Sequence, residues 1–192
     1  MASDGFWPLL MAPDGFWWLL AASDGRCTQL DELNVCANQL TGVIPEELGR
    51  CVALVKILLN RNELSGAIPA SLGRCLELRE LYLSSNQLSG VIPAAIGRCA
   101  ALTTLSISDN RLACCPEGRI SHLPKELGSC TALADLKVDV AVVPNKELDL
   151  PAPLRLRHSD GALVLQAVGT AASADKSPMT TRSKTVPITV RP

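Results

Sequence analysis

The chain repeats one pattern of 24 residues, and this repeat constrains its fold more than any other feature. Residues 76–99 read LELRELYLSSNQLSGVIPAAIGRC, and the same pattern precedes and follows them without gaps. Each copy opens as L-x-x-L-x-L-x-x-N-x-L, with conservative apolar exchanges. A unit of this length cannot bury its apolar face alone, so stacked copies must share one core. Four copies begin at Leu30, Leu54, Leu78 and Leu102, and a fifth begins at Leu133.

Each L-x-L segment predicts a short β-strand, because side chains alternate between the two faces of a strand. The two apolar residues then point inward, and stacked strands form a parallel sheet over one continuous core. The asparagine after each strand carries both hydrogen-bond donors and an acceptor. We therefore expect it to satisfy buried backbone groups of the turn. The predicted structural ladder consists of Asn38, Asn62, Asn86 and Asn110.

The repeat continues as L-[TS]-G-x-I-P-x-x-[LI]-G-R-C in residues 40–51, 64–75 and 88–99. The first glycine permits a bend, and the proline blocks a continuing helix or ladder. With these motifs the chain resembles the plant-type subclass of the leucine-rich repeat family over roughly residues 28–144. The resemblance implies an α/β repeat solenoid, a short curved stack of about five repeats with a parallel sheet on its concave face.

The solenoid is expected to occupy residues 28–150, with a C-terminal segment at 151–192. Seven extra residues after the fourth copy predict an inserted loop at 113–119. Alternation from Leu154 and the turn signal at Asp160 predict a short hairpin over 154–165 that covers the open edge. The residues after 167 are rich in Ala, Ser, Thr and Pro, so we expect a disordered tail.

Residues 1–27 repeat with a different period of ten residues, marked by Asp-Gly pairs. All three Trp and both Phe of the protein lie in this segment. Because a solenoid must cover its first apolar edge, an aromatic N-terminal cap is the preferred interpretation. A cleaved signal peptide is an alternative, although a basic start and an unbroken apolar run are missing. An anchor to a membrane surface or a partner is another, and no segment is long enough to span a bilayer.

Five of the eight cysteines occupy the same G-x-C slot of the repeat. Side chains stacked in this way point in one direction, which is poor geometry for a disulfide. We therefore predict a ladder of buried free thiols. No C-x-x-C pair occurs, so no structural zinc or other cofactor is expected. Free thiols favour a reducing compartment, and thus a cytoplasmic location over secretion. The five cysteines are Cys27, Cys51, Cys75, Cys99 and Cys130.

The outward positions of the predicted strands form columns across the concave face. One column alternates in charge through Glu32, Lys56 and Glu80, which are expected to pair. The next column sets Leu58 beside Tyr82, an apolar pair with the character of an interface hot spot. The simpler alternative is that these are solvated strand positions. The predicted partner-binding residues are Lys56, Leu58, Asn60, Arg61, Arg79, Glu80, Tyr82, Ser84, Thr104, Ser106, Ser108 and Asp109.

A slot on the opposite side of each repeat carries arginine in three successive copies. A stripe of arginines can hold phosphate or carboxylate groups. The simpler interpretation is a solvated edge whose arginines pair with nearby glutamates. The arginines are Arg50, Arg74 and Arg98, and the glutamates are Glu46, Glu47 and Glu77.

An enzymatic function is not expected from this sequence. Catalysis needs a nucleophile or an acid–base pair held in a pocket, and His122 and His158 both lie outside the regular repeats. Cys114 and Cys115, near His122, lack the spacing of a closed metal site. The net charge of −1 gives no field that would favour nucleic acid.

The preferred function is a non-catalytic interaction module that presents its concave face to another protein, in signalling or scaffolding. The resemblance leaves two alternatives. One is a secreted protein that binds a surface or polymer, such as carbohydrate, a wall-degrading enzyme or ice; it needs a uniform array of Thr, Ser or Asn, and the columns are not uniform. The other is a receptor fragment without independent function. The identity of the partner and the oligomeric state do not follow from the sequence.

Overall fold

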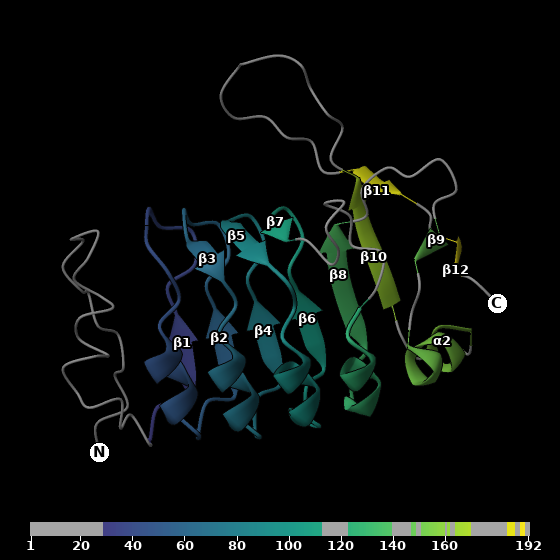
Figure 1. Cartoon of the computed structure of the whole chain (residues 1–192), viewed down its shortest axis with the longest axis horizontal. Coiled ribbons are helices and arrows are strands. Elements are labelled where there is room, and N and C mark those ends of the chain that lie inside the picture. The colour runs from purple at the N-terminus through teal and green to yellow at the C-terminus, as the bar shows by residue number, and fades with distance from the viewer. Residues whose placement is uncertain are drawn as a thin grey trace, which may run out of the picture.

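The computed structural model describes residues 29–112, 123–139, 147–148, 151–159, 161, 164–169, 184–186 and 189–190. In Figure 1 the repeats stand side by side as a row of strands, each followed by a short helical turn. Several sequence predictions concern residues outside these ranges. They are the aromatic segment 1–27, the insert 113–119, and the residues Cys27, Cys114, Cys115 and His122.

One large sheet contains the L-x-L segment of every repeat. Its strand order is β1-β2-β4-β6-β8-β10-β11, in which β11 alone runs antiparallel to its neighbour. Adjacent strands are offset by one whole repeat, so that Leu33 pairs with Ile57 and Ile57 with Leu81. The five strands predicted from the repeats are therefore confirmed, with two more added at the C-terminal end. Their bounds are β1 Glu32–Asn34, β2 Lys56–Leu58, β4 Glu80–Tyr82, β6 Thr104–Ser106, β8 Asp135–Asp139, β10 Val164–Gly169 and β11 Lys184–Val186.

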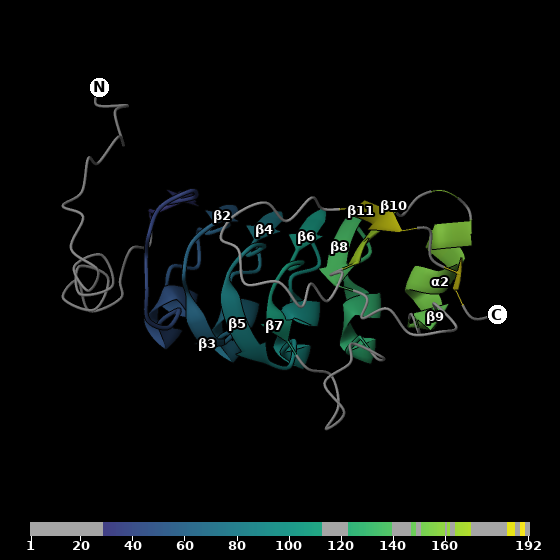
Figure 2. The same cartoon turned by 90° about the horizontal axis from the view of Figure 1, so that it is seen from above.

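The opposite side of the stack carries a narrow second sheet and a row of 3-10 helices, as Figure 2 shows from above. Each helix begins directly after the proline of the I-P or L-P motif, where the proline interrupts the extended chain. The second sheet has the order β3-β5-β7, with bounds Ser65–Ala67, Gln87–Gly90 and Arg111–Leu112. The helices are η1 Glu46–Arg50, η2 Ala70–Arg74, η3 Ala94–Arg98 and η4 Lys125–Ser129.

Successive 3-10 helices touch through their glycines. A Cβ atom added to Gly49 would overlap the carbonyl oxygen of Ser71, and one added to Gly73 would overlap that of Ala95. Gly97 stands in the same relation to Glu126, across the junction that contains the insert. The second glycine of the repeat is therefore required for close approach between backbones.

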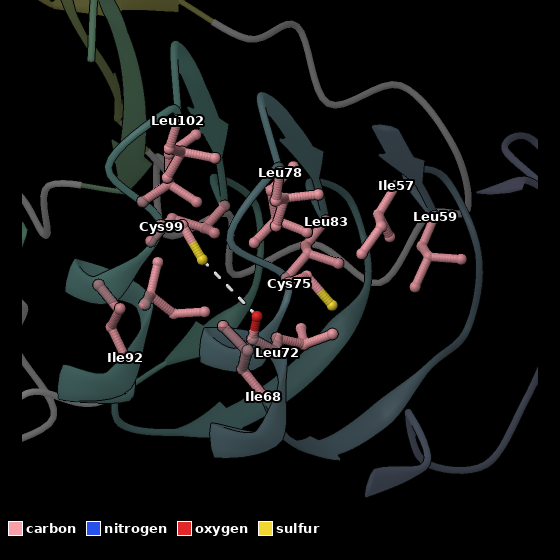
Figure 3. Close-up of a cluster of buried hydrophobic side chains, with 14 of the residues drawn as sticks. Ile57, Leu59, Ile68, Leu72, Cys75, Leu78, Leu83, Ile92, Cys99 and Leu102 are labelled. Carbon is pink, nitrogen blue, oxygen red and sulfur yellow. Dashed lines mark hydrogen bonds between the residues drawn. The ribbon is translucent and has the colours of Figure 1, made fainter. Parts of the chain in front are cut away.

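The core is a continuous column of apolar side chains between the large sheet and the helices. Figure 3 shows part of it, with Ile57 from β2, with Leu59 and Leu83 next to the strands, and with Leu72 and Ile92 from the opposite side. Residues such as Ile57, Leu81 and Leu83 are at most 1% exposed. Burial of this kind stabilises the stack by roughly 25 cal/mol per Å² of apolar surface removed from water.

A sixth, irregular repeat contains residues 151–159 and 164–169, and the predicted hairpin over 154–165 is wrong in its first half. Residues Ala152–Ser159 form helix α2, in which Leu154 is fully buried. The Leu154 N–H donates to the Pro151 carbonyl oxygen at 2.9 Å, and the Leu127 N–H makes the matching bond to Pro124 at 3.0 Å. Helix α2 therefore takes the place of a fifth 3-10 helix, and β10 continues the large sheet.

The prediction of a disordered tail is wrong for the parts that the structure describes. Residues Lys184–Val186 form β11 on the outer edge of β10. Residues Thr189–Val190 form β12, which pairs in parallel with β9 (Glu147–Leu148). The stretch KTVPITV is rich in β-branched residues, which favour strands. Composition averaged over the whole tail concealed this local preference.

Candidate functional site

The asparagine ladder joins each repeat to the one before it, as the sequence predicts. The Asn62 side-chain amide donates to the carbonyl oxygens of Val35 and Leu59, both at 3.0 Å. Its Oδ1 accepts the Leu40 N–H at 3.0 Å. Asn86 and Asn110 repeat this arrangement one and two copies later. The ladder satisfies buried backbone, so these asparagines are structural residues.

The residue before each ladder asparagine has a left-handed backbone. Its φ is 54° at Ala37, 58° at Arg61, 56° at Ser85 and 59° at Asp109. Non-glycine residues rarely adopt this conformation. Its recurrence at every turn shows that the turn geometry imposes it. The backbone of two predicted partner-binding residues, Arg61 and Asp109, is therefore fixed by this bend.

The thiol ladder is confirmed at the four positions that the structure describes. Cys51, Cys75, Cys99 and Cys130 are free and 0% exposed. The Cys99 Sγ atom lies 3.6 Å from the Leu72 carbonyl oxygen, which accepts its hydrogen (Figure 3). Burial raises the pKa of Cys99 to about 12 and that of Cys130 to about 11. These thiols stay protonated and are packing groups rather than nucleophiles.

The predicted apolar pair lies on the second and third strands of the large sheet. Leu58 on β2 and Tyr82 on β4 are direct neighbours in the parallel register, and both side chains are partly exposed. Beside them the Lys56 Nζ lies 3.0 Å from a Glu80 carboxylate oxygen. The hydrogen bond to Glu80 is the main cause of the raised pKa of Lys56, and the charge of Glu32 adds to it. The predicted pairing between Lys56 and Glu80 is confirmed.

The other predicted partner-binding residues differ in how much surface they offer. Arg61 and Arg79 are exposed, whereas Asn60, Ser84, Thr104 and Asp109 are partly exposed. Ser106 and Ser108 are buried, with 3% and 7% of their surface exposed. The most accessible of the predicted site residues thus adjoin β2 and β4.

One ion pair of this face was absent from the predicted site. The Lys137 Nζ lies 3.5 Å from a carboxylate oxygen of Asp135, two residues earlier on β8. The other carboxylate oxygen of Asp135 is buried and accepts no hydrogen bond. Asp135 pairs in register with Thr104 on one side and with Val164 on the other, so it belongs to the column that contains Lys56 and Glu80. The position of Asp135 in this column was the sequence signal that could have identified the ion pair.

The arginine stripe lies on the opposite side, where Arg50, Arg74 and Arg98 are exposed. Within the described ranges Arg74 and Arg98 make no ion pair, so the expected local pairing with glutamates is not found for these two. A hollow of about 250 Å³ adjoins the stripe between η3 and η4. It is lined by Ala94, Ala95, Gly97, Arg98, Glu126 and Ser129.

The part of the chain that the structure describes has neither a cluster of metal ligands nor a membrane-spanning helix. There, no group of three or more His, Cys, Asp or Glu side chains is placed to hold a metal ion. Over the same residues, no helix has the length and apolar character needed to cross a membrane.

Comparison with known proteins identifies the repeats. Models of the leucine-rich repeat match residues 29–51 and 53–112, and no curated protein matches the chain. The PEPR1–AtPEP1 crystal structure covers 77% of the chain at 30% identity with a TM-score of 0.63. The leucine-rich repeat ectodomain of the receptor kinase SOBIR1 from Arabidopsis thaliana covers 58% of the chain at 29% identity with a TM-score of 0.51. The Leptospira interrogans protein LIC12759 covers 74% of the chain at 25% identity with a TM-score of 0.55.

The stacked parallel sheet, the 3-10 turns and the asparagine ladder define a repeat solenoid. The chain belongs to the leucine-rich repeat family, and its likeness to plant receptor ectodomains is consistent with the plant-type subclass. It spans 19% of the PEPR1 structure, 56% of the SOBIR1 ectodomain and 32% of LIC12759. The matching models include no enzyme family.

Proposed function

We propose that the chain is a non-catalytic module that binds another protein through its concave face, in signalling or scaffolding. The observation that carries this proposal is the Leu58–Tyr82 pair. Two adjacent, partly exposed apolar side chains lie here at the centre of a polar face. An apolar centre within a polar rim is the usual anatomy of a protein interface, and tyrosine is enriched among hot-spot residues.

The size of the face suits an interface of modest area. The seven strands of the large sheet, at about 4.8 Å spacing, extend across about 29 Å. A standard interface buries about 800 Å² on each partner. The concave face therefore suits a peptide or one edge of a folded domain better than a partner that wraps the whole solenoid.

Relatives support a binding role without naming the partner. A leucine-rich repeat module similar to this one is the ectodomain of the receptor kinase SOBIR1, and the PEPR1 structure is a complex with AtPEP1. Because the chain spans only 19% of that structure, the ligand of PEPR1 is not carried over to it.

Affinity capture from native cell extract tests the proposal with two matched double variants. L58D/Y82D places charge at the apolar centre, while V52D/L76D makes the same change on exposed apolar residues outside the concave face. Val52 and Leu76 are 49% and 58% exposed, so both variants are expected to fold. Circular dichroism and thermal unfolding check this point.

We expect at least one captured protein to be lost with L58D/Y82D and retained with V52D/L76D. Capture that survives L58D/Y82D, or that is lost only with V52D/L76D, would move the binding surface away from the concave face. Absence of any specific protein would contradict the interaction role and favour a surface-binding protein or a receptor fragment.

We also propose a cytoplasmic location for the protein. The four buried free thiols favour a reducing, cytoplasmic compartment. The similar module of SOBIR1 is an ectodomain, which favours the opposite location outside the cell. Cell fractionation with sequencing of the mature N-terminus decides between them. Retention of residues 1–27 in a cytosolic fraction supports the cytoplasmic proposal, and their removal with export contradicts it.

A further inference from the structure

Not every charged side chain around the apolar pair has an ion-pair partner. Lys56 and Glu80 neutralise one another at 3.0 Å, and Asp135 and Lys137 do so at 3.5 Å. Arg61 and Arg79 remain. Within the described part of the chain, neither arginine has an ion-pair partner, and both side chains are exposed.

Arg61 has no carboxylate next to it in its own column. Its neighbours one repeat away at the same turn position are Ala37 and Ser85, and the three share the left-handed backbone. Asp109 lies two repeats away, at about 10 Å for two strand spacings. The Arg61 N–H donates to the Ser84 carbonyl oxygen at 2.9 Å. The backbone of Arg61 is thus fixed while its guanidinium faces solvent.

The backbone of Arg79, which directly precedes β4, is fixed by hydrogen bonds in a comparable way. Its N–H donates to the Val55 carbonyl oxygen at 2.8 Å. Its own carbonyl oxygen accepts the N–H groups of Thr103 and Thr104, at 2.8 and 3.0 Å, and the Thr103 hydroxyl at 2.9 Å. Because the backbone is already fixed, binding a ligand through the guanidinium costs less conformational entropy.

The two arginines bracket the apolar pair along the strand direction. Arg79 precedes Tyr82 by three residues, and Arg61 follows Leu58 by three residues on the adjacent strand. Six residue steps at about 3.3 Å place their backbones about 20 Å apart. The carboxylates at matching positions lie farther away: Glu32 is on the edge strand β1 beyond Lys56, and Asp109 is two repeats from Arg61. Arg61 and Arg79 therefore flank the apolar pair as two exposed cationic side chains without an ion-pair partner among the described residues.

We propose that the concave face binds an extended acidic segment of its partner, with an apolar side chain on Leu58 and Tyr82 and a carboxylate on each of Arg61 and Arg79. This inference rests on the proposed function and specifies its ligand. Guanidinium groups bind carboxylates through two parallel hydrogen bonds, which gives geometric selectivity as well as affinity. A segment of about six extended residues spans the two arginines.

Selection from a display library of random 12-residue peptides tests the inference on the full-length chain. Wild type, R61Q/R79Q, R74Q/R98Q and L58D/Y82D are immobilised in parallel. R74Q/R98Q is the matched control, because it removes two exposed arginines on the opposite side. Peptides enriched on the wild type are then synthesised, and their dissociation constants are measured at low and high salt.

We expect enriched peptides with two acidic residues flanking an apolar one, about four to six positions apart. R61Q/R79Q should weaken their binding at least tenfold, since hydrogen bonds to charged groups contribute about 1.5–3 kcal/mol each. R74Q/R98Q should leave the binding unchanged. Added salt should weaken binding to the wild type more than binding to R61Q/R79Q.

Two kinds of contrary result can be told apart. Neutral or basic peptides that still require Leu58 and Tyr82, or acidic peptides bound equally by R61Q/R79Q, would overturn the acidic ligand and leave the proposed function standing. Peptides bound equally by L58D/Y82D, or no enrichment at all, would overturn both.

Discussion

The Asn86 side-chain amide donates to the Leu59 carbonyl oxygen of the preceding repeat at 3.0 Å. The same amide reaches the Leu83 carbonyl oxygen of its own repeat at 3.1 Å. Its Oδ1 accepts the Leu64 N–H at 3.0 Å. The amide also reaches the Ser84 carbonyl oxygen at 3.3 Å, so one side chain bonds four backbone groups that belong to two repeats.

Replacing Asn86 by alanine should cost about 3 kcal/mol of unfolding free energy, because buried backbone groups lose their partners. Asn38 is the matched control. Its amide bonds only to Val35 and Cys36 of its own repeat, so Asn38→Ala should cost about 1 kcal/mol. Urea unfolding with an unchanged m value measures both. Equal losses at the two positions would show that the bond between repeats adds no stability.

Gly97→Ala should destabilise the protein by about 3 kcal/mol, because the new Cβ would overlap the Glu126 backbone of the next helix. Gly42→Ala is the control, with no atom within 4 Å of the added Cβ and a φ of +86°. The control should therefore lose only about 1 kcal/mol to backbone strain. Thermal unfolding of both variants measures the difference. A loss at Gly97 no larger than at Gly42 would contradict the close packing of the helices.

The stability of the protein should fall as the pH rises from about 9 towards 12. The Cys99 thiol has a pKa of about 12 in the folded chain, against an ordinary value of 9.0. In this window the unfolded chain loses protons that the folded chain retains, so raising the pH favours unfolding. Cys99→Ala removes one such thiol, and its urea midpoint should depend less on pH than that of the wild type. The comparison at pH 7 isolates the packing contribution, and parallel pH profiles would contradict the prediction.

Leu154→Ala should cost about 3 kcal/mol, because Leu154 is 0% exposed and belongs to the shared core. Leu76→Ala is the control, since that side chain is 58% exposed and its removal should change stability by less than about 0.5 kcal/mol. A single unfolding transition shifted only by Leu154→Ala would place the sixth repeat in the cooperative unit. An unshifted transition would mean that helix α2 folds separately from the solenoid.

The register of the sheet could be predicted because a fixed repeat and a period of two place every outward residue in a column. Leu58 beside Tyr82 and Lys56 beside Glu80 follow directly from this arithmetic. The exposure of a small side chain does not, because it depends on the neighbours around it. Ser106 and Ser108 were for that reason expected on the surface and are buried.

The sixth repeat was missed because two patterns compete in residues 151–157. The alternation Leu-Arg-Leu-Arg indicates a strand, whereas Leu154 stands three residues after Pro151, as Leu127 does after Pro124. The hydrogen bond to the proline carbonyl selects the helix. The close approach at Gly97 was equally hidden, because the distance between neighbouring helices is a tertiary property.

The glycine contacts between 3-10 helices also determine the radius of the arc. A solenoid bends because its outer layer is spaced more widely than its sheet, and the small rotation between units sets the shape of the inner surface. Glycine lets the outer layer approach as closely as backbone atoms allow. Bulkier residues in this slot would open the outer layer and tighten the bend. The close glycine contacts thus keep the inner surface from curving more tightly across the strands.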